Sequence, residues 1–248
     1  MKMNGKMNGK KAFEMAVLSQ DAYLPPAEFA AKYRDFEFIS EESTQVYIVQ
    51  LCGSICVAFR GTEIESFQDI KLDLEFLKSP EPGGWSYCHT GFQEGIDLVW
   101  EELEAKVRAL QQETNLPLVS TGHSLGAALA TICHARLGDM ATSELYTFGS
   151  PRVFDKAGAR GFRYQRPLVY RFVNHTDLVT RIPKIGYHHV GIPYYLNEAG
   201  ALKIDPPWWY RSWEYAKGML GGFVRFEVDS LEDHPVDNYV NKLARYAK

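Results

Sequence analysis

One pentapeptide constrains the fold more than any other part of this sequence. Gly122-His123-Ser124-Leu125-Gly126 fits the pattern Gly-x-Ser-x-Gly, in which a serine occupies a sharp, strained turn between a strand and a helix. A short apolar run precedes the pattern at 116–120, and an alanine-rich segment follows it at 127–137. Gly122 and Gly126 let the two backbones approach closely. The pentapeptide therefore predicts a nucleophile elbow with Ser124 exposed at the start of a helix.

The order of the predicted elements around this elbow indicates the fold class. β-branched and aromatic runs predict strands at 46–51, 55–59, 116–120, 144–148 and 168–173, with a hairpin at 194–197 and 202–204. Helical spacing of apolar residues predicts helices at 11–23, 91–110, 127–137 and 237–248. Alternating strands and helices predict an α/β fold, with a mostly parallel central sheet and helices on both faces. No repeat or linker divides the chain, so we expect a single domain over residues 1–248.

Composition narrows the class of protein. The formal net charge is −4 over 248 residues, which gives no basic surface for nucleic acid. No apolar stretch approaches the roughly 20 residues that span a bilayer, so we expect no integral membrane segment. The basic start of the chain, with its repeated Lys-Met-Asn-Gly, lacks the apolar region of a secretory signal. We expect a protein that stays inside the cell or one whose signal has been removed.

The four cysteines do not indicate a metal site or a disulfide framework. Their spacing differs from that of zinc ligands, and four are too few to staple a small domain. We expect reduced, buried thiols at Cys52, Cys56, Cys88 and Cys133. The histidines and acidic residues are scattered, so we expect no metal and no cofactor.

A serine needs a base to take its proton and an acid to orient that base. In hydrolases with this elbow, the acid and then the histidine follow the serine along the chain. Asp177 lies in the polar cluster 174–177, directly after the predicted strand 168–173. A carboxylate there can reach across the edge of the sheet, so Asp177 is the candidate acid. An aspartate in such a cluster can also simply cap a turn.

Four histidines downstream of the elbow are candidates for the base: His175, His188, His189 and His234. The first is too close in sequence to Asp177 to face it. The next two are expected in the loop or strand that enters the second hairpin. His234 precedes the last predicted helix, where the fold presents its base on a loop, so it is the candidate base, and His189 is the reserve. His134 lies within the helix after the elbow and is expected to pack or to face solvent.

Several separate motifs together resemble the class 3 lipases, the family of fungal triacylglycerol lipases and their bacterial relatives. The motifs are Phe59-Arg60-Gly61-Thr62, His89-Thr90-Gly91-Phe92, Tyr146-Thr147-Phe148-Gly149-Ser150-Pro151-Arg152-Val153 and the run 171–183 around Asp177. The resemblance implies an α/β-hydrolase fold and a catalytic triad of Ser124, Asp177 and His234. It also implies an oxyanion hole formed by the N–H groups of Leu125 and Thr62. Thr180 and Phe154 depart from residues common in the family.

The resemblance implies a serine carboxylester hydrolase that cleaves acylglycerol esters through an acyl-serine intermediate. A feruloyl-type esterase or a phospholipase A1 is the alternative enzyme, because these share the elbow and the triad. A non-catalytic binding protein would lack part of the triad, which is present here. The expected partner is an acyl ester or lipid, and the sequence does not indicate the oligomeric state.

Two segments are candidates for contact with lipid. Segment 63–77, in which Ile64 and Phe67 share one helical face, is a candidate lid over the site. The aromatic segment 206–226 is a candidate for transient contact with a lipid interface. A permanently packed surface helix and a core or subunit contact are the respective alternatives.

Overall fold

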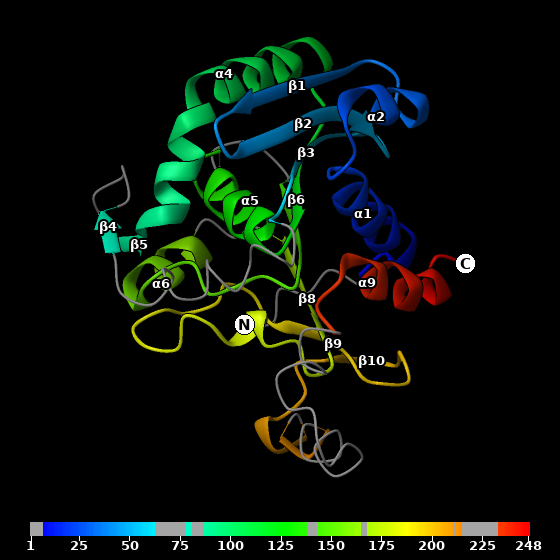
Figure 1. Ribbon diagram of the computed structural model, residues 1–248, viewed down its shortest axis with the longest axis vertical. Helices are drawn as coiled ribbons and strands as arrows, with labels where there is room; N and C mark the ends of the chain where they lie inside the picture. The colour runs from blue at the N-terminus through cyan, green and yellow to red at the C-terminus, as the bar shows by residue number, and fades with distance from the viewer. Residues whose placement is uncertain are drawn as a thin grey trace.

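The computed structural model describes residues 7–62, 78–80, 87–137, 143–164, 168–210, 212–214 and 233–248. Eight strands form one central sheet in the order β1-β2-β3-β6-β7-β8-β9-β10 (Figure 1). They are β1 (Phe36–Glu41), β2 (Thr44–Leu51), β3 (Ser54–Phe59), β6 (Leu118–His123), β7 (Glu144–Phe148), β8 (Leu168–Asn174), β9 (Pro193–Leu196) and β10 (Leu202–Ile204). The five strands from β3 to β9 pair in parallel, and the outer strands pair antiparallel. The predicted mostly parallel sheet is confirmed.

Alternation along the strands divides the core into two layers. On β2, Val46 and Ile48 enter one hydrophobic cluster, while Tyr47 and Val49 enter the other. Side chains of a strand point alternately to the two faces of a sheet, so each face needs its own apolar cover. The sheet is therefore buried on both sides, as expected of parallel strands that helices connect.

Helices cover the two faces in two separate groups (Figure 1). The helices whose side chains enter the first cluster are α4 (Thr90–Thr114), α5 (Leu125–Arg136) and α6 (Lys156–Tyr164). Those that enter the second cluster are α1 (Gly9–Asp21), α2 (Pro26–Lys32) and α9 (Val236–Leu243). The first and last of these helices, α1 and α9, pack against each other.

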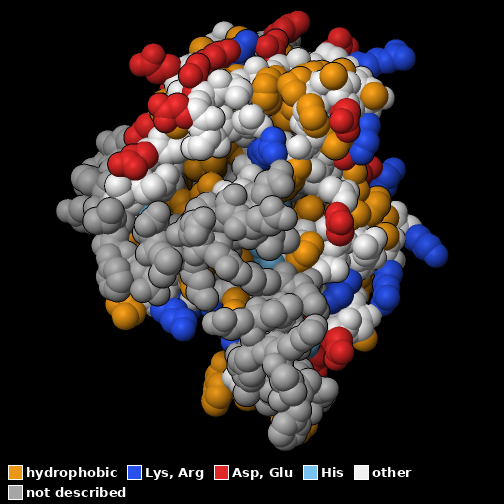
Figure 2. Space-filling view, in the orientation of Figure 1, with side chains coloured by type: hydrophobic (Ala, Val, Ile, Leu, Met, Phe, Trp, Pro, Cys, Tyr) orange, Lys and Arg blue, Asp and Glu red, His pale blue; other side chains and the backbone are white. Residues whose placement is uncertain are grey.

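The sequence of α4 explains which of its sides is buried. Its apolar residues recur every three or four positions and are buried, namely Phe92, Ile96, Val99, Leu103 and Val107. Glu94, Asp97, Glu101 and Glu102 occupy the exposed side, and acidic groups gather over this helix in the space-filling view (Figure 2). Such a stripe of apolar residues is what holds a surface helix on its sheet.

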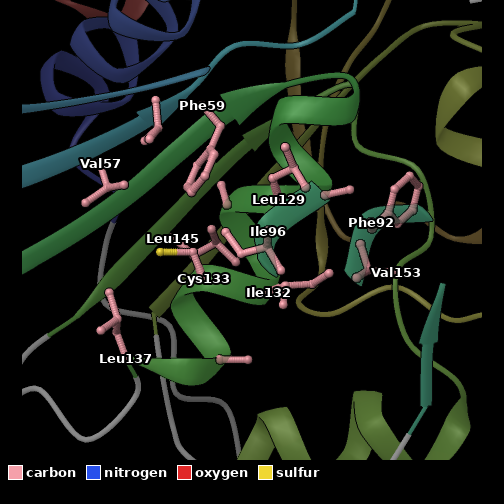
Figure 3. Close-up of a cluster of buried hydrophobic side chains, with 14 of the residues drawn as sticks. Val57, Phe59, Phe92, Ile96, Leu129, Ile132, Cys133, Leu137, Leu145 and Val153 are labelled. Carbon is pink, nitrogen blue, oxygen red and sulfur yellow. The ribbon is translucent and has the colours of Figure 1, made fainter. Parts of the chain in front are cut away.

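Helix α5 contributes the centre of the first cluster (Figure 3). Leu129, Ile132 and Cys133 of α5 lie between Val57 and Phe59 of β3 and side chains of α4. Each fully buried aliphatic or aromatic side chain of this kind contributes about 1.5–3 kcal/mol. The helix that follows the elbow is thus fixed by packing on both sides.

Most predicted elements are present within one to four residues of their expected bounds. The sequence did not predict β1, α2, α6 or the two-stranded sheet of β4 (Lys78–Pro80) and β5 (Tyr87–His89). The last predicted helix is shorter than expected, since α9 ends at Leu243 and a 3-10 turn covers Ala244–Tyr246. No helix in the described parts of the chain is long and apolar enough to cross a membrane.

The expectation of four buried thiols was wrong for one of them. All four cysteines are free, and three of them are buried, but Cys52 is exposed. It occupies the turn between β2 and β3, where its φ is +54°. A two-residue turn at the end of a hairpin projects into solvent, so its first residue cannot be buried.

Candidate active site

Ser124 occupies the predicted elbow between β6 and α5. Its backbone has φ +56° and ψ −127°, a conformation that non-glycine residues rarely adopt. Its N–H donates to the carbonyl of Phe148 on β7 (3.0 Å), which ties the strained residue to the sheet. The side chain thus stands at the end of the central parallel strands, at the start of α5.

The two elbow glycines lie where the strand and the helix come closest. A Cβ atom on Gly122 would clash with the backbone of Gly126, and one on Gly126 would clash with the carbonyls of Phe59 and Arg60. Any side chain at either position would push α5 away from β6 and β3. The predicted reason for glycine at both positions is therefore confirmed by the packing of the backbone.

Three side chains from distant parts of the chain form one hydrogen-bonded series. Nε2 of His234 lies 2.8 Å from Oγ of Ser124, and its Nδ1 lies 3.0 Å from Oδ2 and 3.1 Å from Oδ1 of Asp177. A carboxylate oxygen accepts, so Nδ1 carries the hydrogen and Nε2 accepts from the serine hydroxyl. All three residues are buried, so the prediction that Ser124 is exposed was wrong, because its side chain packs against His234. This order of groups is what a serine needs to be activated as a nucleophile.

The carboxylate of Asp177 receives two further hydrogen bonds. The N–H of Val179 donates to Oδ1 (2.9 Å), and the hydroxyl of Tyr239 on α9 donates to Oδ2 (2.6 Å). Burial raises the pKa of Tyr239 well above its usual value, and the neighbouring Asp177 raises it further. The phenol therefore stays protonated and remains a donor to Asp177.

His123, the residue before Ser124, lies against the backbone of His234. Its Nε2 lies 2.7 Å from the carbonyl oxygen of His234, and Tyr23 OH lies 2.9 Å from its Nδ1. Burial lowers the pKa of His123 well below its ordinary value, and the nearby His234 lowers it further. His123 is thus neutral, donates from Nε2 and accepts from Tyr23 at Nδ1. It holds the backbone of His234 in place.

The other histidines named as candidates for the base have different contacts. Nδ1 of His175 lies 3.0 Å from Oδ2 of Asp233, and Nε2 of His189 lies 2.7 Å from the carbonyl of Thr180. His188 is exposed in the loop before β9. His134 is buried in α5, with Nδ1 3.1 Å from Oγ of Ser120. Of the candidate histidines, His234 is the one whose side chain lies within hydrogen-bond distance of Ser124.

The two residues predicted to form the oxyanion hole belong to two segments that approach each other at the elbow. Leu125 is the first residue of α5, and Thr62 follows the end of β3 by three residues and is partly exposed. The close approach of Gly126 to Phe59 and Arg60 brings the end of β3 beside the start of α5. The candidate lid, 63–77, lies outside the described residues, as does much of the aromatic segment 206–226.

Three residues near the site were not predicted from the sequence as functional residues. Tyr239 contacts Asp177, Asp233 precedes the base, and Gly149 lies against both members of the Asp177–His234 pair. The signal for Gly149 was present in the motif 146–153, where a glycine follows a strand. Asp233 belongs to the Asp233-His234-Pro235 context, which resembles that of the base in the class 3 lipases, but the sequence assigned no role to Asp233 or Tyr239.

Comparison with known proteins identifies the family. Residues 56–187, just over half of the chain, match the family Lipase (class 3). This chain belongs to the class 3 lipase family. The secreted mono- and diacylglycerol lipase 1 of Fusarium solani is 38% identical over 125 residues, which are 47% of this chain and 36% of that protein. The lipase of Rhizomucor miehei is 32% identical over 160 residues, which are 58% of this chain and 42% of that protein.

Solved structures of class 3 lipases share the fold. The Rhizomucor miehei lipase in its propeptide complex has a TM-score of 0.70 and 24% identity, covering 81% of this chain and 72% of that one. A triacylglycerol lipase described as having a serine protease triad at its catalytic centre gives the same score, with 84% of that chain covered. The predicted α/β-hydrolase fold is confirmed. The chain spans between 36% and 56% of the length of four curated relatives that it matches.

Metal-ligating side chains do not cluster in the described parts of this family member. No group of three or more His, Cys, Asp or Glu residues there has an arrangement that could hold a metal ion. The acidic and imidazole groups around Ser124 are instead hydrogen-bonded to one another and to the backbone.

Proposed function

We propose that this chain is a serine carboxylester hydrolase that cleaves acylglycerol esters. The observation that carries the proposal is the hydrogen-bonded series of Ser124, His234 and Asp177 on a strained elbow. The family membership and the names of the relatives, which include mono- and diacylglycerol lipases, support the substrate class. A central eight-stranded sheet with one hydrophobic cluster on each face supports a single domain over residues 1–248.

The proposed reaction has two steps. In the first, His234 takes the proton of Ser124 as Oγ attacks the ester carbonyl, and the N–H groups of Leu125 and Thr62 stabilise the oxyanion. The tetrahedral intermediate collapses, the C–O bond to glycerol breaks, and His234 gives its proton to the departing alcohol. In the second step, His234 takes a proton from water as the water attacks acyl-Ser124. The second tetrahedral intermediate then collapses, the bond between the acyl carbon and Oγ breaks, His234 returns its proton to Ser124, and the carboxylic acid leaves. Asp177 stabilises the imidazolium in both steps, and no cofactor takes part.

The first test is hydrolysis of p-nitrophenyl butyrate by the Ser124→Ala variant. The hydroxyl is the proposed nucleophile, so we expect kcat to fall at least about 1,000-fold. Ser19, a buried serine on α1 that donates to Met15, gives the matched control, and Ser19→Ala should keep its activity. Full activity of Ser124→Ala would remove the basis of the proposal.

The second test compares substrates. Tributyrin, triolein, phosphatidylcholine and methyl ferulate differ in the alcohol and acyl groups that the pocket must hold. Release of fatty acid from the two triglycerides at higher kcat/KM than from the others is the expected result. Turnover of methyl ferulate alone would replace the lipase assignment with a feruloyl-type esterase, and preference for phosphatidylcholine would replace it with a phospholipase.

We also propose transient contact with a lipid interface through Trp208 and Trp209, which are 74% and 59% exposed. The segment 208–210 follows β10 and lies at the lower end of the view in Figure 1, in orange. The next residue, Tyr210, packs its ring against Tyr195 of β9 (centroids 6.2 Å apart), so the tryptophans face outward from an anchored turn. Tryptophan is enriched where one side of a protein is apolar and the other is wet.

Sedimentation with phosphatidylcholine vesicles tests this contact. In the Ser124→Ala background, which removes turnover, Trp208→Ser/Trp209→Ser should lower the bound fraction several-fold. Ile185→Ser replaces an apolar side chain that is 79% exposed in a different loop, and it should not change binding. Equal binding by all three proteins would contradict the assignment to the tryptophans.

A further inference from the structure

A second polar cluster lies directly beside the series of Ser124, His234 and Asp177. Its centre is Asp233, the residue before His234, whose side chain is 22% exposed. Its Oδ2 accepts from the N–H of Thr176 (3.0 Å), from the hydroxyl of Thr176 (2.5 Å) and from Nδ1 of His175 (3.0 Å). The acceptor thus sits on the loop that carries His234, while its donors sit on the turn that leads to Asp177.

Asn174 adds a second link between the same two segments. Its Nδ2 donates to the backbone carbonyl of Asp233 (2.7 Å) and to Oδ1 of Asp233 (3.3 Å). Nζ of Lys242 on α9 donates to Oδ1 of Asn174 (2.6 Å) and to the carbonyl of Asn197 (3.0 Å). An ammonium group can only donate, so it fixes which end of the amide is oxygen. The NH₂ group must therefore face Asp233.

We propose that Asp233 is a positioning residue, whose hydrogen bonds to residues 174–176 set the place of His234 relative to Asp177. The proposal deepens the proposed function and rests on it. His234 and Asp177 are 57 positions apart in sequence, but their immediate neighbours are joined by five hydrogen bonds. Asp233 itself contacts none of the reacting atoms in the proposed mechanism.

The electrostatics of Asp233 suit this role. Burial by itself raises the pKa of its carboxyl group, but the hydrogen bonds from His175 and Thr176 outweigh burial and leave the pKa below its ordinary value. Asp233 is therefore a carboxylate at neutral pH, and hydrogen bonds to an ionised acceptor are stronger than those between neutral groups. A neutral side chain of the same shape would hold the loop less firmly.

A displacement of His234 would affect the reaction more than substrate binding. Its Nε2 must stay within hydrogen-bond reach of Ser124, and a shift of about 1 Å in such a group can cost about 100-fold in rate. The disturbed contacts position His234 and do not hold the substrate in the proposed mechanism, so substrate binding should change little. The hydrogen bond between His234 and Asp177 would be loosened as well, so the pH dependence of kcat should change.

The test uses Asp233→Asn with p-nitrophenyl butyrate as a soluble substrate. We expect kcat to fall about 10- to 100-fold, with KM within about twofold of the wild-type value. The pH profile of kcat should also be displaced from that of the wild type. Asp237→Asn removes an exposed carboxylate four residues away on α9, and it should leave kcat and the pH profile unchanged.

Asn174→Asp gives a second, independent variant. It places a carboxylate where an NH₂ group now faces the carbonyl and carboxylate of Asp233, so the same loss of kcat and the same shift in pH profile are expected. Near-ultraviolet circular dichroism measures the folded fraction of each variant without use of the reactive serine, so that rates refer to folded protein.

Three outcomes are decisive. A lower kcat with a shifted pH profile supports the proposal. Wild-type kcat in Asp233→Asn, or a loss that disappears after correction for the folded fraction, overturns it while leaving the proposed function intact. A wild-type protein that hydrolyses no ester would overturn the proposed function itself.

Discussion

Gly149 has a positive φ of +62° and lies against two of the proposed catalytic side chains. A Cβ atom at this position would come within 2.9 Å of Oδ2 of Asp177 and 3.0 Å of Cε1 of His234. We expect Gly149→Ala to lower kcat for p-nitrophenyl butyrate at least about tenfold, because the methyl group must displace the Asp–His pair.

Gly53→Ala is the matched control for that change. Gly53 also has a positive φ, +67°, but nothing lies within 4 Å of the position that its Cβ would take. Both variants should lose about 1 kcal/mol of stability to backbone strain, and only Gly149→Ala should lose activity. Equal kcat values for the two variants would show that the pair is not displaced.

Tyr239 offers a smaller test at the same scale. Tyr239→Phe removes the hydroxyl that donates to Asp177 and accepts from the N–H of Asn174. Loss of one donor leaves the carboxylate with Val179 and His234, so we expect kcat to fall several-fold rather than to vanish. Steady-state kinetics at pH 8 would measure the change, and a loss above about 1,000-fold would mean that Tyr239 has a larger role than the structure indicates.

The sequence predicted Ser124, Asp177 and His234 but not the residues that hold them. The three have recognisable contexts, which are a glycine-flanked turn, a polar cluster after a strand and a loop before a helix. Asp233 and Tyr239 reach Thr176 and Asp177 across 57 and 62 positions of sequence. The Asp233-His234-Pro235 context resembles that of the base in the family, but the partners of Asp233 and Tyr239 are distant in sequence, so only the folded chain shows what these two residues hold.

The contact between β6 and α5 is a prediction at the scale of elements. Gly126→Ala would force the helix away from the backbone of Phe59 and Arg60, so we expect the melting temperature to fall by at least about 5 °C. Gly91→Ala is the control, since its Cβ would meet only His89, at 3.7 Å. Thermal unfolding followed by circular dichroism distinguishes the two, and a stable Gly126→Ala would mean that the two backbones can separate without cost.

The missed elements share a physical cause. The helix predicted at 11–23 is followed by Pro25-Pro26, which is typical of a helix end, yet α2 begins at Pro26, because proline fits the first turn of a helix. Strand β1 is exposed at three of its six positions and buried at one, and an edge strand needs little apolar sequence. Elements such as these are stabilised by their neighbours more than by their own residues.

The lowered pKa values of two buried histidines predict how the stability of the whole molecule depends on pH. Burial lowers the pKa of His134 to about 3 and lowers that of His123 well below its ordinary value. Below about pH 6.5 the unfolded chain binds protons at these positions and the native protein does not. Stability should therefore fall as pH decreases, by about 1.4 kcal/mol per pH unit for each histidine, over the window from about 6.5 to about 3 for His134.

Urea unfolding between pH 6 and 4 measures this dependence. His134→Gln should lower the slope of unfolding free energy against pH by about 1.4 kcal/mol per unit. His188→Gln, which changes an exposed histidine, should leave the slope as it is. An unchanged slope in His134→Gln would show that this residue is not held neutral in the core.

The distance along the chain between Ser124 and His234 has a consequence during synthesis of the protein. The two residues are 110 positions apart, and the segment that carries the base is anchored by α9, which packs on α1 at the other end of the described chain. During translation, Ser124 therefore leaves the ribosome before His234 is synthesised. Until the segment around His234 is synthesised and packs against the rest of the chain, the elbow lacks its proposed base. The proposed ester hydrolysis cannot begin before then.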